Sequence, residues 1–434
     1  MITVIGTGTG TGTDAGADAE LQGPGRDAAL AGATLVVGAR RHLDAAPVPA
    51  GAERFVLGAL SPALDAVEAH LAVPGAGVVV LASGDPGFFG IVRALAGRFG
   101  PAALQVLPSA PAVAVAFARA GLPWDDAAVV SAHGRDPRTA LNVCRAHHKT
   151  AVLTGPGCGP AELGAALART GIPRTLVVAT ALGSADEHVE RLSPAEAAAR
   201  VWPDPVSLVL CLDETRAVAP AQRTLAGGRS APGRWALPET EFAHRDSMVT
   251  KYEVRALALA RLGPATGDLV WDIGAGSGSV AVECARLGAA AIAVERTAEG
   301  VERVRANAAA HGVDIETVHG SAPDVLGELP DPDAVFVGGG GRQLPAIVAA
   351  CARRARRCVV VTLAALDRVP EVRAALAGAG LAPDGVLLHS SRLSPLPGEV
   401  TRLSATNPVF VLWGTAPAPH PASDFPDPAE GATP

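Results

Sequence analysis

The sequence is poor in aromatic residues, in paired cysteines and in long apolar runs. Nine Phe, five Trp and one Tyr make only 15 aromatic residues among 434, so Ala, Val and Leu are expected to fill the cores. Its six cysteines include no Cys-x-x-Cys pair, which argues against a disulfide framework and against a zinc site. No uninterrupted apolar run approaches the ~18 residues of a membrane span, and no basic leader precedes the strand-like Ile2-Thr3-Val4-Ile5. We therefore expect a soluble, cytoplasmic protein with no membrane partner and no metal.

An excess of positive charge is also missing. The chain carries 36 Lys and Arg residues against 43 Asp and Glu residues, a net charge of -7. This balance argues against a protein built mainly to neutralise the phosphates of a nucleic acid. Lysine occurs only at Lys149 and Lys251, so almost every positive charge is an arginine. An anionic small molecule would need a local patch of such residues.

The distribution of apolar residues predicts two α/β domains. Short β-branched runs alternate with Ala-rich helical stretches over residues 2–212, and the same alternation returns from 269–273 to 386–388 and 409–412. Such a pattern is typical of sheets whose strands are buried on both faces. A Gly-, Pro- and Ser-rich stretch separates the two series. The predicted organisation is a domain over 1–213, a linker over 214–236, a second domain over 237–415 and a disordered tail over 416–434.

A glycine-rich turn in the second half predicts a nucleoside site. Residues 270–279 read Val-Trp-Asp-Ile-Gly-Ala-Gly-Ser-Gly-Ser and pass from a predicted strand into a predicted helix. Glu295 follows Gly274 by 21 residues, at the end of the next predicted strand, where its carboxylate could accept two ribose hydroxyl hydrogen bonds. The turn lacks the Gly-x-Gly-x-x-Gly of dinucleotide sites, and Asp272 suits a zwitterionic methionine group better than a pyrophosphate. The alternative is a turn that merely reverses the chain.

This combination resembles the class I S-adenosylmethionine-dependent methyltransferases. The resemblance implies that Glu295 holds the cofactor ribose and that Gly320, Ser321 and Ala322 flank the adenine. It also implies that the methionine portion is lined by Gly274, Ala275, Gly276, Ser277 and Gly278.

Two further segments make the resemblance more specific. Residues 248–255, Met-Val-Thr-Lys-Tyr-Glu-Val-Arg, and 337–341, Val-Gly-Gly-Gly-Gly, resemble the cobalamin-pathway enzymes that methylate carbon 15 of a precorrin and decarboxylate it. The resemblance implies that Thr250 contacts the cofactor. The second segment carries none of the acidic or Asn-Pro motifs that amino-group methyltransferases place there, which disfavours methylation of nucleic acid or protein.

The first half carries a different set of motifs. Residues 81–90, Leu-Ala-Ser-Gly-Asp-Pro-Gly-Phe-Phe-Gly, follow a predicted strand, although a Gly-Asp-Pro turn alone is common. Four other segments accompany it in the order found in tetrapyrrole methylases of the carbon-5 type: 38–43, 107–113, 121–126 and 131–135. The resemblance implies a class III, two-lobed α/β domain whose cofactor contacts are Gly6, Gly8, Ser83, Gly84, Asp85, Pro86 and Ser109.

The opening loop of the first half departs from that family. Residues 6–14 alternate Gly and Thr where a shorter glycine-rich turn is usual, so it stays open which of Gly6, Gly8 and Gly10 touches a ligand. Cationic residues flank the motifs, and the fork of an arginine suits the carboxylates of a precorrin. A solvated surface charge is the alternative reading for each of them. The candidate substrate contacts are Arg40, Arg41, His42, His133, Arg135 and, in the second half, Lys251.

Over roughly residues 1–415 the chain resembles the bifunctional precorrin-6Y C5,15-methyltransferases (decarboxylating) of cobalamin biosynthesis. The resemblance implies two S-adenosylmethionine sites per chain, and methylation of precorrin-6B, the reduced precorrin-6Y, at carbons 5 and 15. Loss of the ring C acetate carboxyl as carbon dioxide would then give precorrin-8. It also implies a Rossmann-like second domain and a homo-oligomer, with a tetramer as one form.

The residues leave several alternatives open. One half could be a non-catalytic S-adenosylmethionine-binding module, so that only one methylation takes place. A nicotinamide-dependent reductase and a nucleic-acid methyltransferase fit the glycine-rich loops less well. The proton donor for decarboxylation is not identified, and the reachable candidates are Glu241, His244, Lys251 and Tyr252.

Overall fold

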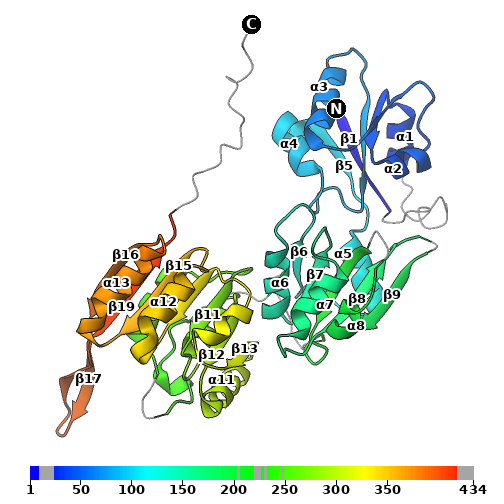
Figure 1. Ribbon diagram of the computed structural model, residues 1–434. Helices are drawn as coiled ribbons and strands as arrows, with labels where there is room; N and C mark the ends of the chain where they lie inside the picture. Colours follow the sequence, from blue (N-terminus) through cyan, green and yellow to red (C-terminus); the bar gives the residue numbers. More distant parts are fainter. Residues whose placement is uncertain are drawn as a thin grey trace. The chain divides into compact units, whose positions relative to one another are not determined.

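The computed structural model describes residues 1–8, 24–184, 186–202, 206–218, 226–228, 232–245 and 249–417 (Figure 1). Most of the Gly-Thr loop, including Gly10, lies outside these residues, as do much of the predicted linker and nearly all of the predicted disordered tail. The chain forms two compact units, Met1–Arg229 and Ser230–Pro434. The division between them falls inside the stretch 214–236.

The first lobe of the first unit is built on a parallel sheet of order β3-β2-β4-β1-β5. Apolar clusters on both faces of this sheet bury its central strands. The register pairs Thr7 with Ser83, so the carboxyl ends of β1 and β4 lie side by side. The strands are β1 (Ile2–Thr7), β2 (Leu35–Gly38), β3 (Glu53–Val56), β4 (Val78–Ser83) and β5 (Leu104–Leu107). The helices are α1 (Pro24–Ala31), α2 (Arg40–Ala45), α3 (Leu60–Leu71), α4 (Val92–Phe99) and the short η2 (Pro101–Ala103).

The second lobe has a mixed sheet of order β6-β7-β10-β8-β9, in which β6 and β7 are the only parallel neighbours among the described strands. Its fully buried Lys149 donates from Nζ to Asp126 Oδ1 at 2.6 Å and to the Pro123 carbonyl at 3.1 Å, so this charge is paired within the core. The strands are β6 (Ala128–Ser131), β7 (Lys149–Leu153), β8 (Thr175–Thr180), β9 (His188–Leu192) and β10 (Val206–Leu212). The helices are α5 (Ala112–Ala120), α6 (Pro137–Ala146), α7 (Pro160–Ala168) and α8 (Pro194–Ala198).

The second unit has a seven-stranded sheet of order β13-β12-β11-β14-β15-β19-β16. Its first five strands are parallel, and β19 runs antiparallel to β15 and β16. The strand order reverses between β11 and β14, the position at which open α/β sheets bind their ligands. The strands are β11 (Leu269–Ile273), β12 (Ala290–Glu295), β13 (Glu316–His319), β14 (Ala334–Val337), β15 (Cys358–Leu363), β16 (Ala382–Leu388) and β19 (Val409–Thr415).

Helices cover both faces of this sheet, and a separate hairpin projects from it (Figure 1). The hairpin consists of β17 (Ser391–Leu396) and β18 (Val400–Ala405), which pair only with each other among the described strands. The helices are α9 (Tyr252–Leu262), α10 (Ser279–Arg286), α11 (Ala298–Ala310), α12 (Leu344–Ala352), α13 (Val369–Gly378), and the short η3 (Glu239–Glu241), η4 (Asp324–Glu328), η5 (Gly341–Gln343) and η6 (Leu366–Arg368).

The predicted fold class is confirmed: a two-lobed α/β unit precedes a Rossmann-like one. As expected from the shortage of aromatic residues, Ala, Val and Leu dominate the core clusters. All six cysteines are reduced and buried. Within the described ranges, no helix combines the length and the apolar character needed to cross a membrane.

Candidate functional site

A cavity of about 1120 Å³ lies at the carboxyl ends of the parallel strands in the second unit. Its lining includes the glycine-rich turn after β11, the end of β12, the turn after β13 and the block of glycines after β14. The predicted residues that line it are Thr250, Lys251, Gly274, Ala275, Gly276, Ser277, Glu295, Gly320, Ser321 and Ala322. Gly278 does not line it: a Cβ there would lie 2.9 Å from a Val304 methyl group, so this glycine permits close packing of α10 against α11.

The glycine-rich turn is shaped by left-handed backbone and by one carboxylate. Gly274 and Gly276 have φ angles of 73° and 58°, which side chains with a Cβ rarely adopt. Glu295 Oε2 accepts a hydrogen bond from the Gly276 amide at 3.0 Å, while its Oε1 accepts from the amide and hydroxyl of Thr297 at 3.0 and 2.9 Å. Each carboxylate oxygen has further acceptor capacity. Glu295 is therefore held at the cavity wall and can still accept hydrogen bonds from the hydroxyl groups of a ligand.

Asp272 provides a second acidic group beneath the turn. The residue is fully buried, and its Oδ2 accepts a hydrogen bond from the Ala281 amide at 3.0 Å. Burial, with a further contribution from the charge of Glu295, raises the pKa of Asp272 from 3.8 to about 7. A cationic group bound in the cavity would favour the ionised form of this carboxyl.

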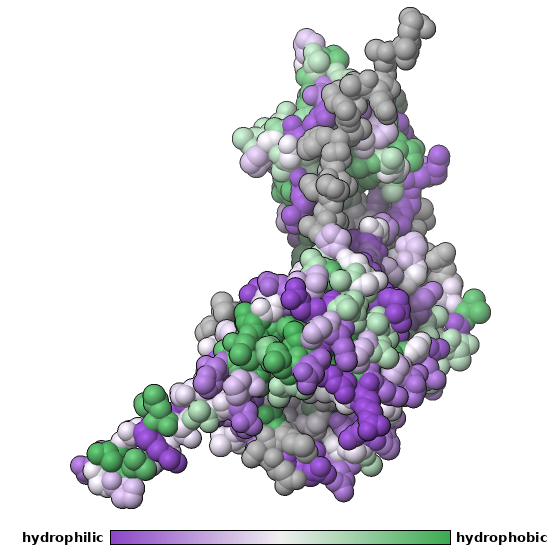
Figure 2. All heavy atoms as spheres, turned by 60° about the vertical axis from the view of Figure 1, so that its left-hand side comes forward, coloured by the Kyte–Doolittle hydropathy of each residue, from purple (hydrophilic) through white to green (hydrophobic). Residues whose placement is uncertain are grey.

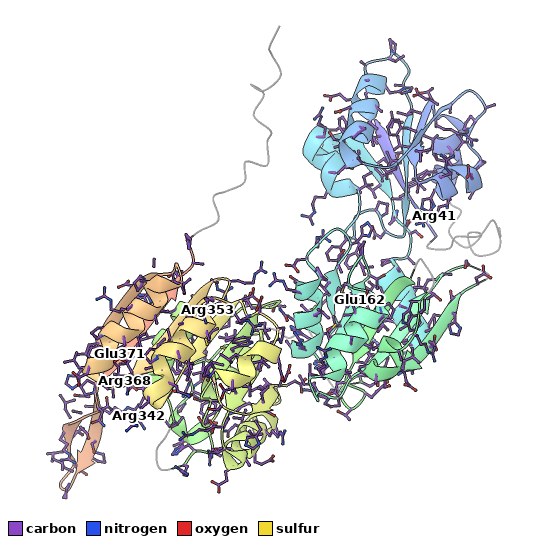
Figure 3. All side chains as sticks on the ribbon, viewed as in Figure 1. Arg41, Glu162, Arg342, Arg353, Arg368 and Glu371 are labelled. Carbon is purple, nitrogen blue, oxygen red and sulfur yellow. The ribbon has the colours of Figure 1, made fainter. Side chains whose placement is uncertain are left out.

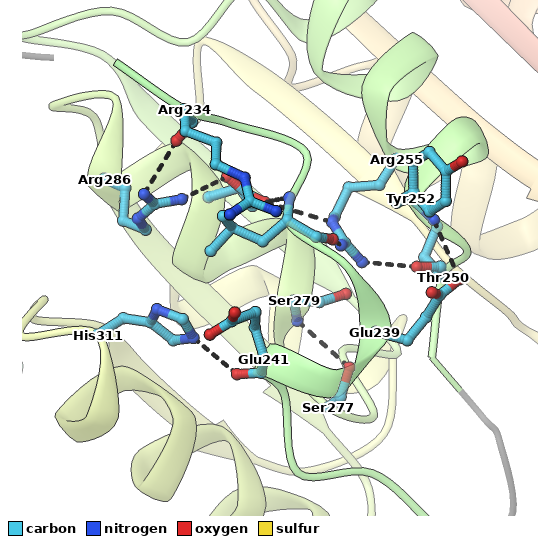
Figure 4. Close-up of polar contacts among 12 residues, drawn as sticks. Arg234, Glu239, Glu241, Thr250, Tyr252, Arg255, Ser277, Ser279, Arg286 and His311 are labelled. Atoms are coloured by element: carbon cyan, nitrogen blue, oxygen red, sulfur yellow. Dashed lines mark hydrogen bonds and ion pairs between the residues drawn. The ribbon is translucent and has the colours of Figure 1, made fainter. Parts of the chain in front are cut away.

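Thr250 and Lys251 reach the cavity because a buried arginine fixes the chain before α9 (Figure 4). Arg255 has no exposed surface and donates to the Thr250 carbonyl at 2.6 Å and to the Leu237 carbonyl. Its charge faces Glu283, 3.5 Å away, which also accepts from the Leu237 amide at 2.7 Å. A buried pair of this kind is costly to break. It fixes the segment on α10, the helix that follows the glycine-rich turn.

The candidate proton donors are not equivalent. Glu241 and His244 are exposed and outside the cavity lining, and Tyr252 is also absent from that lining. Among the four candidates, Lys251 is the one that lines the described cavity.

Four arginines outside the set of predicted site residues line the same cavity. Arg342 belongs to η5 and is labelled in Figure 3. The carbonyl of the preceding Gly341 accepts a hydrogen bond from Arg368 at 2.7 Å. Arg296 directly follows Glu295 and Arg342 directly follows the 337–341 segment, whereas Arg245 and Arg303 lie outside the predicted motifs. Together with Lys251 they give the cavity five basic side chains, the other four being Arg245, Arg296, Arg303 and Arg342.

In the first unit, three predicted residues converge at the carboxyl ends of β1, β4 and β5. A Cβ on Gly6 would lie 2.5 Å from the Gly84 carbonyl oxygen and 2.7 Å from the Ser109 nitrogen, so the three backbones pack in direct contact. Gly84 donates to the Thr7 carbonyl at 2.8 Å and has a φ of 61°. The buried Ser109 Oγ has no hydrogen-bond partner among the described residues. Such a hydroxyl is a candidate contact for a bound polar ligand.

Ser83 is the centre of a polar network beside these backbones. His42 is buried and connects Thr7 Oγ1 at 3.1 Å to Ser83 Oγ at 2.8 Å. The exposed Arg41, labelled in Figure 3, donates to the same Ser83 oxygen at 2.8 Å. The structure therefore places His42 in a supporting position behind Ser83 rather than as an exposed cation. Arg40 is exposed at the start of α2.

The turn that carries Asp85 and Pro86 presents an unexpected aromatic ring. Asp85 Oδ1 accepts from the Gly87 amide at 2.7 Å, and the Pro86 carbonyl accepts from the Val92 amide at 3.2 Å. Phe89 follows with a φ of 53°, a strained value for a bulky residue, and its ring is 46% exposed.

Phe89 connects two of the predicted motifs. The Arg135 guanidinium lies 5.4 Å from its ring centroid, so the Asp85 turn meets the 131–135 turn of the second lobe. His133 is exposed on that turn, and Gly8 lies at the edge of the described residues. Phe89 belongs to the 81–90 motif but was not predicted as a site residue. Its ring is exposed because of the unusual backbone conformation, which the sequence alone does not indicate.

Comparison with known proteins agrees with both units. A family model described as tetrapyrrole (corrin/porphyrin) methylases matches residues 1–198, and one described as a precorrin methyltransferase domain matches residues 240–412. A precorrin-6Y C(5,15)-methyltransferase [decarboxylating] from a Sinorhizobium species is 38% identical over 328 residues, 72% of this chain and 74% of the relative.

Two shorter relatives each match part of the chain. A probable cobalt-precorrin-6B C(15)-methyltransferase (decarboxylating) of Pyrobaculum calidifontis is 34% identical over 187 residues, 42% of this chain and 95% of its own. A cobalt-precorrin-7 C(5)-methyltransferase of Salmonella typhimurium is 36% identical over 179 residues, 41% of this chain and 83% of its own.

The fold and the matches define an S-adenosylmethionine-dependent methyltransferase in which a tetrapyrrole methylase unit precedes a Rossmann-like unit. More specifically, the chain belongs to the family of precorrin-6Y C(5,15)-methyltransferases (decarboxylating). This confirms the predicted family and the predicted enzyme class, a methyltransferase of cobalamin biosynthesis whose reaction includes a decarboxylation. The matches give no support to a nicotinamide-dependent reductase or to a nucleic-acid methyltransferase.

Proposed function

We propose that each unit binds its own S-adenosylmethionine, and that the two units methylate one tetrapyrrole at different carbons. The first unit would act on carbon 5 of precorrin-6B. The second would act on carbon 15 and release the ring C acetate carboxyl as carbon dioxide, giving precorrin-8. One observation carries the proposal: each unit has its own set of glycine-containing turns at the carboxyl ends of parallel strands.

The residues of the second unit fit the cofactor. Glu295 would accept the ribose hydroxyls, Gly320, Ser321 and Ala322 would flank the adenine, and the turn Gly274–Ser277 would hold the methionine portion beside Asp272. When bound, the cofactor supplies a methyl group already activated on a sulfonium. The protein needs to align the reacting atoms and to exclude water, and a cavity at the carboxyl ends of the strands suits the first task.

In the first unit, Ser83, Gly84, Asp85, Pro86, Ser109 and the Gly6–Gly8 segment would hold the second cofactor. The close packing of Gly6, Gly84 and Ser109 supports this assignment, as does the unpartnered Ser109 hydroxyl. Arg40, Arg41, His133 and Arg135 would meet the substrate, with His42 orienting Ser83 from behind.

The substrate is a polycarboxylate, and the basic residues in the second cavity suit it. Arginine can bind a carboxylate through two parallel hydrogen bonds, whereas lysine acts as a compact point charge. We assign the propionate and acetate groups to the four cavity arginines. We further propose that Lys251 Nζ holds a proton close to the macrocycle during decarboxylation.

The chain is further proposed to form a homo-oligomer, a tetramer being the expected form, through the β17–β18 hairpin of the second unit. Leu393 and Leu403 face each other across the hairpin and are 77% and 68% exposed. Figure 2 shows apolar residues on this projecting element. A second copy would cover them, because a hairpin of this kind presents the same face in every copy. The cytoplasmic location remains a prediction.

Titration of the full chain with S-adenosylhomocysteine tests the assignment of two sites. The wild-type chain is expected to bind two equivalents. Glu295→Ala is expected to weaken one of them about 100-fold, or ~3 kcal/mol, because it removes a charged acceptor of several hydrogen bonds. Glu302→Ala, on an exposed face of α11 beside Arg305, is the matched control and should keep both equivalents.

A parallel assay follows carbon dioxide and labelled methyl groups from precorrin-6B. Glu295→Ala should abolish gas release and leave methylation at carbon 5. Two equivalents of ligand with only one methyl group transferred per tetrapyrrole would favour the alternative, in which one unit is a non-catalytic S-adenosylmethionine-binding module. One equivalent in the wild-type chain would contradict a site in each unit.

A further inference from the structure

One guanidinium at the root of the β17–β18 hairpin holds two glutamates of the cavity-bearing unit. Arg392 Nε and one terminal nitrogen donate to the two oxygens of Glu253 at 2.8 and 2.6 Å. The guanidinium also donates to the two oxygens of Glu239 at 2.7 and 3.3 Å, and its carbon lies 4.6 Å from the ring centroid of Tyr252. Both glutamate side chains are largely buried: Glu239 has 13% of its side-chain surface exposed and Glu253 has 18%.

This arrangement differs from an ordinary surface ion pair. Exposed pairs contribute little to stability, because long side chains lose freedom and water screens their charges. Here a forked cation meets each carboxylate through both of its oxygens, and two carboxylates share it. Burial acts to raise the pKa of Glu239, but hydrogen bonds from Arg392 outweigh it and the pKa is lowered. The hydrogen bonds that Arg392 donates to Glu253 likewise lower the pKa of that carboxyl.

The held residues are next to the cavity lining. Glu253 lies in the first turn of α9, directly after Lys251 and Tyr252, and Thr250 and Lys251 line the cavity. The Tyr252 amide donates to Glu239 Oε1 at 3.3 Å, which ties the start of α9 to η3 (Figure 4). Arg392 therefore fixes the helix start that presents Thr250 and Lys251.

The other end of the hairpin root also reaches the cavity. Strand β18 ends at Ala405, and Thr406 and Asn407 follow it. All three residues belong to the cavity lining. Thr406 is bound to Ser390 by a hydroxyl contact of 2.6 Å and by its amide at 3.0 Å, which closes the root. The hairpin thus meets the cavity at two places, through its own last residues and through the glutamates that Arg392 holds.

We propose that Arg392 is a positioning residue that couples the β17–β18 hairpin to cofactor binding in the second unit. It does so by fixing the start of α9, which presents Thr250 and Lys251 to the cavity. The inference rests on the proposed function of this cavity. Because side chains alternate along a strand, Arg392 lies on one face of the hairpin while the exposed Leu393 and Leu403 lie on the other. A second copy could therefore cover the leucine face without displacing the contacts of Arg392 with Glu239 and Glu253.

The test compares variants of the full chain by titration with S-adenosylhomocysteine. Arg392→Gln is expected to weaken the Glu295-dependent equivalent about 10-fold, equal to ~1.4 kcal/mol, and to leave the other equivalent unchanged. Arg392→Lys should lie between the two, because an ammonium keeps the charge but cannot form the two forked contacts. Arg402→Gln, on the neighbouring strand and exposed, is the matched control and should bind as the wild type does.

A spectroscopic readout separates positioning from general destabilisation. Tyr252 is the only tyrosine in the sequence, so ¹³C-labelled tyrosine gives a single set of ring signals from the contact itself. In the wild-type chain these signals should shift on addition of S-adenosylhomocysteine. In Arg392→Gln they should take a different position and respond less. Arg392→Lys carries the same comparison if the glutamine variant does not fold.

The outcomes distinguish the two levels of the proposal. Wild-type affinity in both Arg392 variants, with ligand-dependent tyrosine shifts unchanged, would overturn the role of Arg392 and leave the cavity assignment intact. A wild-type chain with no Glu295-dependent equivalent would overturn the assignment of the cavity, and with it the coupling.

Discussion

The two units place their sites at the same position of an α/β sheet but build them from different chemistry. In the second unit, carboxylates shape the site: Glu295 braces the glycine-rich turn and Asp272 lies beneath it. In the first unit, backbone packing at Gly6 and a network of hydroxyl groups around His42 take that place. The topology of the sheet therefore fixes where a ligand can bind. Whether charged side chains or close backbone packing shape the site differs between the two units. The three predictions below use this contrast.

The largest expected effect concerns the pH dependence of Asp272. Its pKa is about 7 in the folded protein, above the ordinary value of 3.8, so folding is favoured when the carboxyl is protonated. This stabilisation is fully present below about pH 4 and is lost as the pH rises through about 7. Asp272→Asn cannot ionise, so its stability relative to the wild type should increase by up to ~4 kcal/mol between pH 4 and 8.

Urea unfolding of both chains without ligand, at a series of pH values, measures this difference. If the free energy of unfolding depended on pH in the same way for both chains, ionisation of the buried Asp272 would cost no stability. Asp384→Asn, on the exposed part of β16, is a control that should not change the pH dependence of stability. Parallel pH curves for the two chains would also remove the main support for the contrast between a site shaped by buried carboxylates and one shaped by backbone packing.

A steric change probes the first unit. Gly6→Ala places a methyl group 2.5 Å from the Gly84 carbonyl oxygen, so β1 and the Asp85 turn must separate. We expect a loss of ~2 kcal/mol in the free energy of unfolding and loss of one S-adenosylhomocysteine equivalent. Gly97→Ala in α4, where a Cβ meets nothing within 4 Å, should instead stabilise the protein by up to ~1 kcal/mol. Equal effects of the two substitutions would contradict the close packing at Gly6.

The smallest effect is expected at Ser109. Its buried hydroxyl has no partner among the described residues, so Ser109→Ala should leave the stability of the ligand-free protein unchanged or slightly higher. If the hydroxyl meets the cofactor, affinity in the first unit should fall about fivefold, or ~1 kcal/mol. Titration and thermal unfolding of the same variant separate the two effects. Lower stability together with unchanged affinity would assign the hydroxyl to the fold rather than to the ligand.

Local sequence predicted what depends on neighbouring residues. A strand, a glycine-rich turn and a helix follow one another at 269–286, and Glu295 ends the next strand, so parallel pairing of β11 and β12 is enough to bring acid and turn together. That prediction needed only the α/β alternation and the rule that ligands bind at carboxyl ends. Gly6 and Ser83 were instead implied by the resemblance to tetrapyrrole methylases, and the pairing of β1 with β4 places them at adjacent strand ends.

Features that depend on distant side chains were not predictable. Arg245 and Arg303 lie outside the predicted motifs, and the residues beside them do not mark their convergence on the cavity. His42 is adjacent to two arginines in sequence, yet its ring turns inward to Thr7 and Ser83. The β17–β18 hairpin was missed because Pro395 interrupts a short, exposed strand that shows no buried face.

The burial of every cysteine has a practical consequence. Packing raises the pKa of Cys158 to about 11 and that of Cys351 to about 12, which keeps these thiols protonated at neutral pH. Maleimide dyes should therefore find little background reactivity on the native protein. A single cysteine introduced at the exposed Thr401 would give a uniquely labelled hairpin, and fluorescence anisotropy of that label would report its association with a second copy.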